Sequence, residues 1–295
     1  MAIPAIQYIE LPTGRLAYRR GGDGPPLLLI HGWGGSSRHW MGAFATLADS
    51  HSIYVLDMPG FGESPPASGL RGLPGLREAV LAFIDELGLG AVKLAGHSLG
   101  GAVSLMVAAA QPSRVEQLAL VSFGLARSPE EEAHYRELGT QLSMMTAIWA
   151  PWLTLSRPWL ALSRPWRQMI WTTPPLPEML AAPLLHRMPD QASLAVGIAD
   201  LAAMDALAAM EGASSQGDPQ VRQAIPLAAM PALVLGGRQD RIFPPASTAS
   251  LAEALPSARL TLIDECGHVP MAEQPEACYG QLRAFFTGLD RAVGG

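Results

Sequence analysis

The sequence predicts an α/β fold, a mostly parallel central sheet flanked by helices, with one helical insertion between core strands. Short apolar segments of strand length, such as 27–30 and 92–95, alternate with helix-like segments such as 99–110. Strands that are apolar on both faces are typical of a parallel sheet buried between helices. The alternation stops near 124 and resumes after 226, which predicts the insertion.

The core is predicted to consist of residues 1–123 and 227–295. Segments 5–11 and 15–20, joined by a Pro-Thr-Gly turn, predict an antiparallel hairpin. Strands are then expected at 27–30, 53–56, 92–95, 117–121, 232–235 and 259–263. Helices are expected at 38–48, 76–87, 99–110, 247–255 and 275–289.

Residues 124–226 are predicted to form a helical cap, or lid, over the core. No clear strand occurs there, and the segment holds five of the seven tryptophans: Trp149, Trp152, Trp159, Trp166 and Trp171. Its prolines favour short helices broken at those positions. The segment 211–220 (EGASSQGDPQ) is expected to be a loop that leads back to the sheet.

The composition excludes several classes of protein. Apolar residues make up 49% and charged residues 16%, which supports a large buried core and argues against disorder. The formal net charge is −6 with no long run of like charge, so we expect no nucleic-acid partner, which would require a concentrated basic face.

The cysteines and the N-terminus point to a cytoplasmic protein. Two cysteines, Cys266 and Cys278, favour a reducing compartment, although one bridge between them stays open. The first twenty residues lack the pattern of a secretory signal, and no apolar run approaches the roughly 18 residues of a membrane span. We expect no integral membrane association, no metal and no organic cofactor.

The strongest chemical signal is Gly-His-Ser-Leu-Gly at 96–100, which places Ser98 between a predicted strand and a predicted helix. G-x-S-x-G in that context is typical of a nucleophile elbow. The sharp turn leaves no room for side chains two positions before and after the serine. For the pentapeptide alone an incidental glycine-rich turn is the alternative; the flanking strand and helix favour the elbow.

A serine hydroxyl becomes a nucleophile only beside a base that an acid orients. Asp240 and His268 each follow a predicted strand, in loops at the sheet edge where Ser98 is expected. Asp264 and Glu265 lie too near His268 in sequence to be the favoured acid. The predicted catalytic residues are therefore Ser98, Asp240 and His268, in that chain order.

Several motifs together resemble the α/β-hydrolase superfamily, in particular its serine esterases with a helical cap. They are HGWGG at 31–35, DMPGFGES at 57–64, GHSLGG at 96–101, Asp240 and GH at 267–268, and they span both core segments. Trp40 and the turns at 31–34 and 57–62 are similar to the pimeloyl-carrier-protein methyl ester esterase and carboxylesterase group. The insertion does not obviously match that group.

The resemblance implies an oxyanion hole formed by the backbone N–H groups of Trp33 and Leu99. It also implies a structural role for the turn at 57–64. Dehalogenases and epoxide hydrolases of the superfamily carry Asp at the elbow, so Ser98 disfavours those activities.

The apolar insertion predicts a substrate pocket beneath the cap. Side chains expected to line it are Trp33, His97, Trp149, Trp152, Trp159, Trp166 and Val269. Simple packing of the cap on the core, or an exposed surface that touches lipid, are the alternatives. For the arginines Arg157, Arg164, Arg167 and Arg187, a solvated helix face is favoured over a site for a carrier protein or a substrate carboxylate.

The predicted function is hydrolysis of small to medium carboxylic esters through an acyl-enzyme on Ser98. The expected partner is a small-molecule ester, with an acyl-carrier-linked ester as a further option. Hydrolysis of a C–C bond, a lactone or an amide, and perhydrolysis, are alternative reactions for the same three catalytic residues. A signalling or receptor-type protein with slow turnover is the alternative from another class.

Overall fold

The structure is a computed structural model, and it describes residues 3–67, 72–155, 181–214 and 217–289. The expected sites at Trp159 and Trp166, and the arginines at 157, 164 and 167, lie outside the described residues. Trp149 and Trp152 lie on a described helix, but their side chains are outside the description.

The centre of the fold is an eight-stranded sheet with the order β1-β2-β4-β3-β5-β6-β7-β8. Its strands are β1 (Ile6–Leu11), β2 (Gly14–Gly21), β3 (Pro26–Ile30), β4 (Ser52–Leu56), β5 (Val92–His97), β6 (Val115–Val121), β7 (Ala232–Gly237) and β8 (Ala258–Ile263). β2 pairs antiparallel with β1 and β4, and the other neighbours are parallel. The expected α/β sheet and its opening hairpin are confirmed.

Helices cover both faces of the sheet, as the doubly apolar strands require. Leu28 and Ile30 of β3 face the layer of α2 (Gly72–Glu86), α3 (Leu99–Ala110) and α11 (Pro245–Ala254). Leu27 and Leu29 face the layer of α1 (Gly42–Leu47) and α13 (Pro275–Thr287). Burying one such leucine contributes roughly 2 kcal/mol relative to leaving it exposed, so both layers stabilise the sheet.

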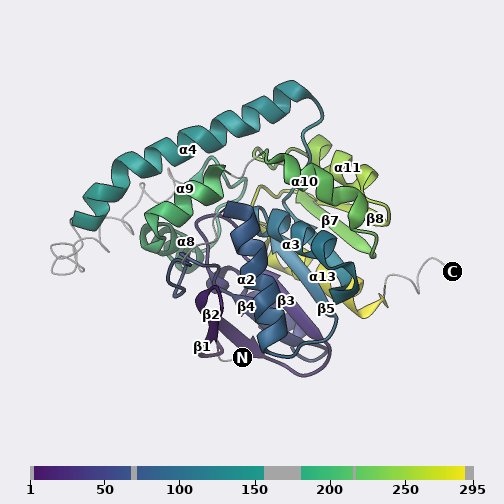
Figure 1. Ribbon diagram of the computed structural model, residues 1–295. Helices are drawn as coiled ribbons and strands as arrows, with labels where there is room; N and C mark the ends of the chain where they lie inside the picture. Colours follow the sequence, from purple (N-terminus) through teal and green to yellow (C-terminus); the bar gives the residue numbers. More distant parts are fainter. Residues whose placement is uncertain (1–2, 68–71, 156–180, 215–216, 290–295) are drawn as a thin grey trace.

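The helices between β6 and β7 differ from the expected pattern. Instead of short helices broken by proline, residues Pro129–Leu155 form one 27-residue helix, α4, which crosses the top of the molecule in Figure 1. Pro129 opens this helix, where its missing N–H costs nothing. α8 (Gln191–Ala203) follows, and α9 (Ala206–Ser214) packs against α4.

The expected loop at 211–220 is wrong in part. Residues 211–214 complete α9, and α10 (Pro219–Ala224) follows Asp218, whose carboxylate caps the helix by accepting the Gln220 N–H. α10 packs on α3, and Ala224 belongs to the same apolar core as that helix. The boundaries of the cap stay a prediction.

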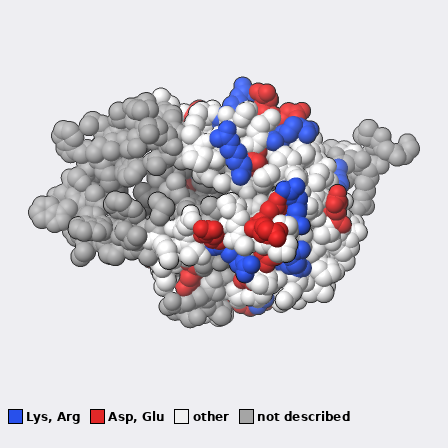
Figure 2. Space-filling view, turned by 90° about the horizontal axis from the view of Figure 1, so that it is seen from above, with Lys and Arg blue, Asp and Glu red and all other residues white. Residues whose placement is uncertain are grey.

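Four short helices complete the described chain: η1 (Ser37–Trp40), η2 (Pro112–Arg114), η3 (Ile225–Leu227) and α12 (Pro270–Glu273). Within the described residues no single helix is long and apolar enough to span a membrane, although the bent pair Gln191–Leu201 and Ala206–Ala213 meets the length and composition criteria together. On the described part of the face in Figure 2, basic and acidic side chains are interspersed.

Both cysteines are free thiols in the buried core, so the bridge that the sequence left open is not formed. Burial, followed by the nearby carboxylate of Glu273, raises the pKa of Cys266 to about 12. Burial likewise raises the pKa of Cys278. Neither sulfur is therefore a thiolate near neutral pH, and we assign both a packing role.

Candidate active site

Ser98 lies on a sharp turn between β5 and α3. Its backbone has φ 52° and ψ −115°, which residues other than glycine rarely adopt. A Cβ on Gly96 would lie 2.0 Å from the Gly100 carbonyl oxygen, and one on Gly100 would lie 2.5 Å from the His31 carbonyl oxygen. The expected lack of room two positions before and after Ser98 is therefore found at both glycines, and it holds the serine at the carboxyl edge of the sheet.

Ser98, His268 and Asp240 come from three separate loops and meet in one hydrogen-bonded chain. His268 Nε2 lies 3.1 Å from Ser98 Oγ, and His268 Nδ1 lies 2.9 Å from Asp240 Oδ2. All three residues are buried. Because a carboxylate only accepts, we assign the ring proton to Nδ1, which leaves Nε2 to accept the serine hydroxyl proton.

The Asp240 carboxylate is fixed by more than the histidine. Its Oδ1 accepts the backbone N–H groups of Ile242 at 2.8 Å and Phe243 at 3.0 Å. The side chain has no exposed surface. With Oδ1 held by two amides, Oδ2 has a single orientation available toward His268, which suits an acid whose task is to orient an imidazole.

His97 packs against His268. Its Nε2 donates to the His268 carbonyl oxygen at 2.8 Å, and the two ring centroids lie 5.0 Å apart. Burial, and then the neighbouring His268, hold the pKa of His97 well below its usual value, so its ring is neutral at neutral pH. The structure places His97 as a support of the His268 loop, and its expected role in lining a pocket stays a prediction.

Of the two backbone N–H groups expected to form an oxyanion hole, that of Leu99 belongs to the elbow and that of Trp33 to the loop after β3. Leu99 is the first residue of α3, so its N–H has no acceptor within the helix. Trp33 follows Gly32, where a Cβ would lie 2.6 Å from His97 Nδ1, so this loop passes close against the elbow. The Trp33 indole N–H donates to the Ala209 carbonyl oxygen of α9 at 2.7 Å.

The turn at 57–64 supports the same edge. Asp57 Oδ1 accepts the Ser37 N–H at 2.5 Å, and its Oδ2 accepts the Glu63 N–H at 2.9 Å. His31 Nε2 accepts the Met58 N–H at 2.9 Å. Asp57 and His31 thus hold loops together, and for Asp57 this agrees with the structural role expected of its turn.

A family model described as the alpha/beta hydrolase family matches residues 27–281. This chain belongs to the alpha/beta hydrolase family. The match spans the elbow, the Asp240 and His268 loops and the segment inserted between β6 and β7.

Three similar proteins illustrate the range of this family. A dihydrolipoyllysine-residue acetyltransferase component of an acetoin cleaving system from Pseudomonas putida is 34% identical over 294 residues, which cover 96% of this chain and 69% of that protein. A pimeloyl-acyl-carrier-protein methyl ester esterase from Aeromonas hydrophila is 28% identical over 265 residues, covering 88% and 95%. An esterase structure from Exiguobacterium antarcticum has a TM-score of 0.74 at 17% identity, covering 95% and 98%, and shows the shared fold.

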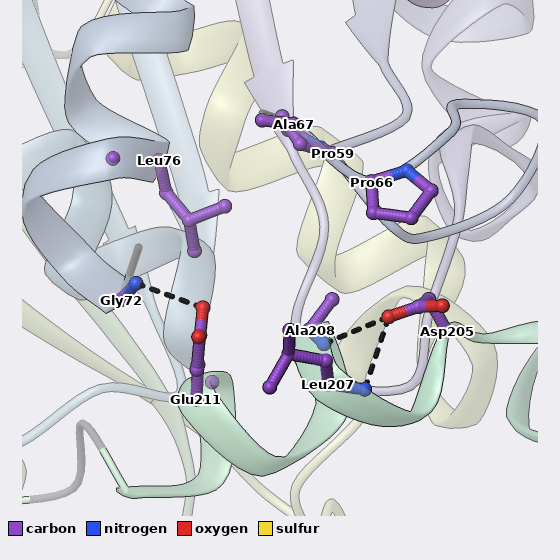
Figure 3. Close-up of a pocket in the computed structure, with 11 residues that line it drawn as sticks. Pro59, Pro66, Ala67, Gly72, Leu76, Asp205, Leu207, Ala208 and Glu211 are labelled. Atoms are coloured by element: carbon purple, nitrogen blue, oxygen red, sulfur yellow. Dashed lines mark hydrogen bonds between the residues drawn. The ribbon is translucent and has the colours of Figure 1, made fainter. Parts of the chain in front are cut away.

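Two cavities flank the site in this alpha/beta hydrolase. The one in Figure 3 lies between the loop at 59–67, the start of α2 and α9. Glu211 Oε2 accepts the Gly72 N–H across it at 3.3 Å, and Asp205 caps the first turn of α9. Gly212 separates this cavity from the Trp33 and Leu99 side chains, because a Cβ there would lie 3.1 Å from each.

The second cavity adjoins the hydrogen-bonded chain more closely. Leu99, Phe123, Tyr135 and Phe243 are among its lining residues. The Phe243 ring stacks on the His268 ring with centroids 6.1 Å apart. Its lining is mainly apolar and aromatic, with Glu132, Asp218 and Arg222 as the charged residues, as in pockets that bind small molecules.

Of the other residues expected to line a pocket, Val269 packs partly buried against the core layer of α13. Arg187, expected on a solvated helix face, is exposed but lies in a bend outside the helices, and its backbone N–H donates to Glu273. Within the described residues, no group of three or more His, Cys, Asp or Glu side chains is arranged to hold a metal ion.

Sequence reasoning missed two buried carboxylates near the site. The Asp200 carboxylate of α8 accepts a hydrogen bond from Ser36 Oγ at 2.8 Å and forms ion pairs with Arg38 and His39. Glu273 of α12 accepts several backbone N–H groups around His268. One signal was available for Asp200, because a single carboxylate in the otherwise apolar helix QASLAVGIADLAA requires a buried partner.

Proposed function

We propose that this chain is a serine-dependent carboxylic ester hydrolase, with Ser98 as the nucleophile. The observation that carries the proposal is the buried chain Ser98–His268–Asp240, with hydrogen bonds of 3.1 Å and 2.9 Å. These lie within the reach of a base that takes the proton of a nucleophile. The esterase named among its relatives supports an ester as the substrate.

In the first half of the proposed reaction, Ser98 Oγ attacks the ester carbonyl carbon while His268 Nε2 takes the hydroxyl proton. Asp240 stabilises the imidazolium that forms. The N–H groups of Trp33 and Leu99 donate to the developing oxyanion, and losing one such donor typically costs about 3 kcal/mol of transition-state stabilisation. The tetrahedral intermediate then collapses, and His268 protonates the departing alcohol.

In the second half, water replaces the alcohol. His268 Nε2 takes a proton from that water as its oxygen attacks the acyl carbon on Ser98, through a second tetrahedral intermediate in the same oxyanion hole. Collapse breaks the acyl–Oγ bond, releases the carboxylic acid and returns the proton to Ser98. Every proton transfer is thus assigned to His268.

We assign the acyl group to the cavity beside Leu99 and Phe243. The cavity is lined by Phe243, whose ring stacks on His268, so an acyl group bound there would lie next to the candidate base. Its aromatic walls favour an apolar chain. The carrier-linked substrate and the cytoplasmic location expected from the sequence stay predictions.

The test is a chain-length series of p-nitrophenyl esters on the wild type and on Ser98→Ala. We expect a maximum at short or medium acyl chains, and a loss of at least about 10³-fold in kcat for Ser98→Ala. Activity retained by Ser98→Ala would contradict the proposal. Equal rates from acetyl to palmitoyl would remove the cavity as the acyl site while leaving the nucleophile intact.

A second candidate is transfer of the acyl group from Ser98 to a thiol instead of to water. The relative named as an acetyltransferase component, at 34% identity, favours this option. Adding dihydrolipoamide during turnover of p-nitrophenyl acetate distinguishes the two. Hydrolysis predicts acetate as the product at all thiol concentrations, whereas transfer predicts S-acetyl dihydrolipoamide that increases with the thiol.

A further inference from the structure

Glu273, the last residue of α12, is buried and accepts four backbone N–H groups. Its Oε1 accepts the Val269 N–H at 2.9 Å. Its Oε2 accepts the N–H groups of Gly267 at 2.9 Å, His186 at 2.8 Å and Arg187 at 2.9 Å. Bonds from N–H to a carboxylate are about twice as strong as bonds between neutral groups, so this one side chain holds two chain segments together.

The two segments are the loop of His268 and the inserted chain that precedes α8. Gly267 and Val269 flank His268 directly, so Glu273 fixes the peptide on both sides of the candidate base. The His268 N–H in turn donates to the Leu184 carbonyl oxygen at 2.9 Å. The backbone around His268 is therefore held by Glu273 and by residues 184–187 together.

We propose that Glu273 is a positioning residue for His268, and that it makes the reactivity of the serine depend on the docking of residues 184–187. This inference rests on the proposed function. Glu273 does not reach the reacting atoms; it acts by keeping His268 Nε2 at 3.1 Å from Ser98 Oγ. A displacement of about 1 Å in such a contact can cost on the order of 100-fold in rate.

The sharpest variant is Glu273→Gln, because it keeps the size of the side chain. An amide has one carbonyl oxygen, and its NH₂ group would point donors at backbone N–H groups that are themselves donors. Part of the four-bond arrangement must therefore break. The matched control is Glu276→Gln, the same substitution at an exposed position in the first turn of α13.

Kinetics on p-nitrophenyl esters give the readout, together with the rate of inactivation by an aryl phosphonate that reacts with activated serines. We expect Glu273→Gln to lower kcat by about 10- to 100-fold, to leave KM within about twofold, and to slow phosphonate inactivation by the same factor as kcat. Glu276→Gln should behave as the wild type. A Glu273→Gln enzyme with wild-type kcat and inactivation rate would overturn the proposal.

A loss of stability is separated from a loss of positioning by Leu282→Ala, which removes a buried side chain in the layer behind the sheet. It should lower Tm while keeping kcat below that Tm; an equal loss of kcat in both variants would overturn the proposal. If Glu273→Gln does not fold, Glu273→Asp is used in its place. The aspartate keeps the negative charge, but its side chain is one methylene shorter, so the carboxylate lies farther from the four N–H groups. We then expect at least threefold lower kcat at unchanged KM, and wild-type kcat would overturn the proposal.

Failure of this inference is distinct from failure of the proposed function. If Ser98 is not the nucleophile, Ser98→Ala keeps its activity and no phosphonate adduct forms on Ser98. If only the role of Glu273 is wrong, Ser98→Ala is inactive while Glu273→Gln turns over like the wild type.

Discussion

The core and the inserted helices hold the candidate site by different means. In the core, steric contact determines the shape of the turn that carries Ser98. This turn can form because Gly96 and Gly100 leave room for carbonyl oxygens where a Cβ would clash. The inserted helices also pack on the core, and they add hydrogen bonds between segments that lie far apart in the chain. The Trp33 indole N–H donates a hydrogen bond to the Ala209 carbonyl oxygen, and the Asp205 N–H donates one to the Gly60 carbonyl oxygen.

Buried carboxylates are the strongest of these polar contacts. Asp200 connects α8 to the loop that carries Trp33, through Ser36, Arg38 and His39. Steric contacts specify which turn forms, whereas bonds between distant segments specify how the finished loops are oriented. The comparison teaches that loss of a catalytic side chain of the core should abolish the chemistry, whereas a weaker attachment of the inserted helices should only reduce it.

The largest effect is expected from the core, with Asp240→Asn. The amide cannot hold His268 in the tautomer that accepts the serine proton, so kcat should fall by about 10⁴-fold. The matched control is Asp264→Asn, an exposed carboxylate paired with Arg238. Steady-state kinetics on a p-nitrophenyl ester check both, and an inactive Asp264→Asn beside an active Asp240→Asn would show that the acid is wrongly assigned.

The next effect concerns the anchor of α8. Asp200→Asn removes the charge that Arg38 and His39 bond, so we expect the free energy of unfolding to fall by about 2 kcal/mol. Asp190→Asn, at the N-cap of the same helix, should cost almost nothing, because asparagine caps helices as well as aspartate does. Urea denaturation measures both; equal losses would mean that Asp200 is no anchor.

The same anchor predicts a pH dependence of stability. Burial works to raise the pKa of Asp200, but hydrogen bonds from His39 and Arg38 outweigh it and hold this pKa below the ordinary value of 3.8. A carboxyl whose folded-state pKa is lowered stabilises the fold above its unfolded-state pKa and loses that contribution as the pH falls through the folded-state pKa. The stability gap between wild type and Asp200→Asn should therefore be full at pH 6 and shrink below about pH 4. A gap that widens toward low pH would contradict this sign.

A smaller effect is expected from Trp33→Phe, which keeps the backbone N–H but removes the indole donor to Ala209. The lost hydrogen bond should lower the free energy of unfolding by about 1 kcal/mol. Since the proposed oxyanion donor is the main-chain N–H, kcat should change by less than about threefold. A far larger loss of kcat would show that the indole itself acts in the reaction.

The smallest effect is expected from thiol reagents, which probe whether the core layer stays closed. Because burial raises the pKa of Cys266 to about 12, the folded protein should not react with dithionitrobenzoate at pH 8, and its activity should be unaffected. After unfolding, both cysteines should react. Rapid reaction of the native protein with loss of activity would show that the core layer opens.

The parts that the sequence predicted are those with local signatures. Gly96-x-Ser98-x-Gly100 encodes its turn in five residues, and the apolar strands encode a parallel sheet. The hydrogen bonds of Glu273 could not be predicted from a local pattern, because its four partners come from two segments about eighty residues apart in the chain. Helix α4 was misjudged because proline was taken as a break, although this helix begins at Pro129 and continues past Pro151.

The most direct test of the central claim is to label the protein with a fluorophosphonate probe and locate the adduct by peptide mass spectrometry. We predict one adduct per chain, on the peptide that carries Ser98, with ester hydrolysis lost in proportion to labelling and no labelling of Ser98→Ala. An adduct on another residue, or hydrolysis that survives complete labelling of Ser98, would contradict the account.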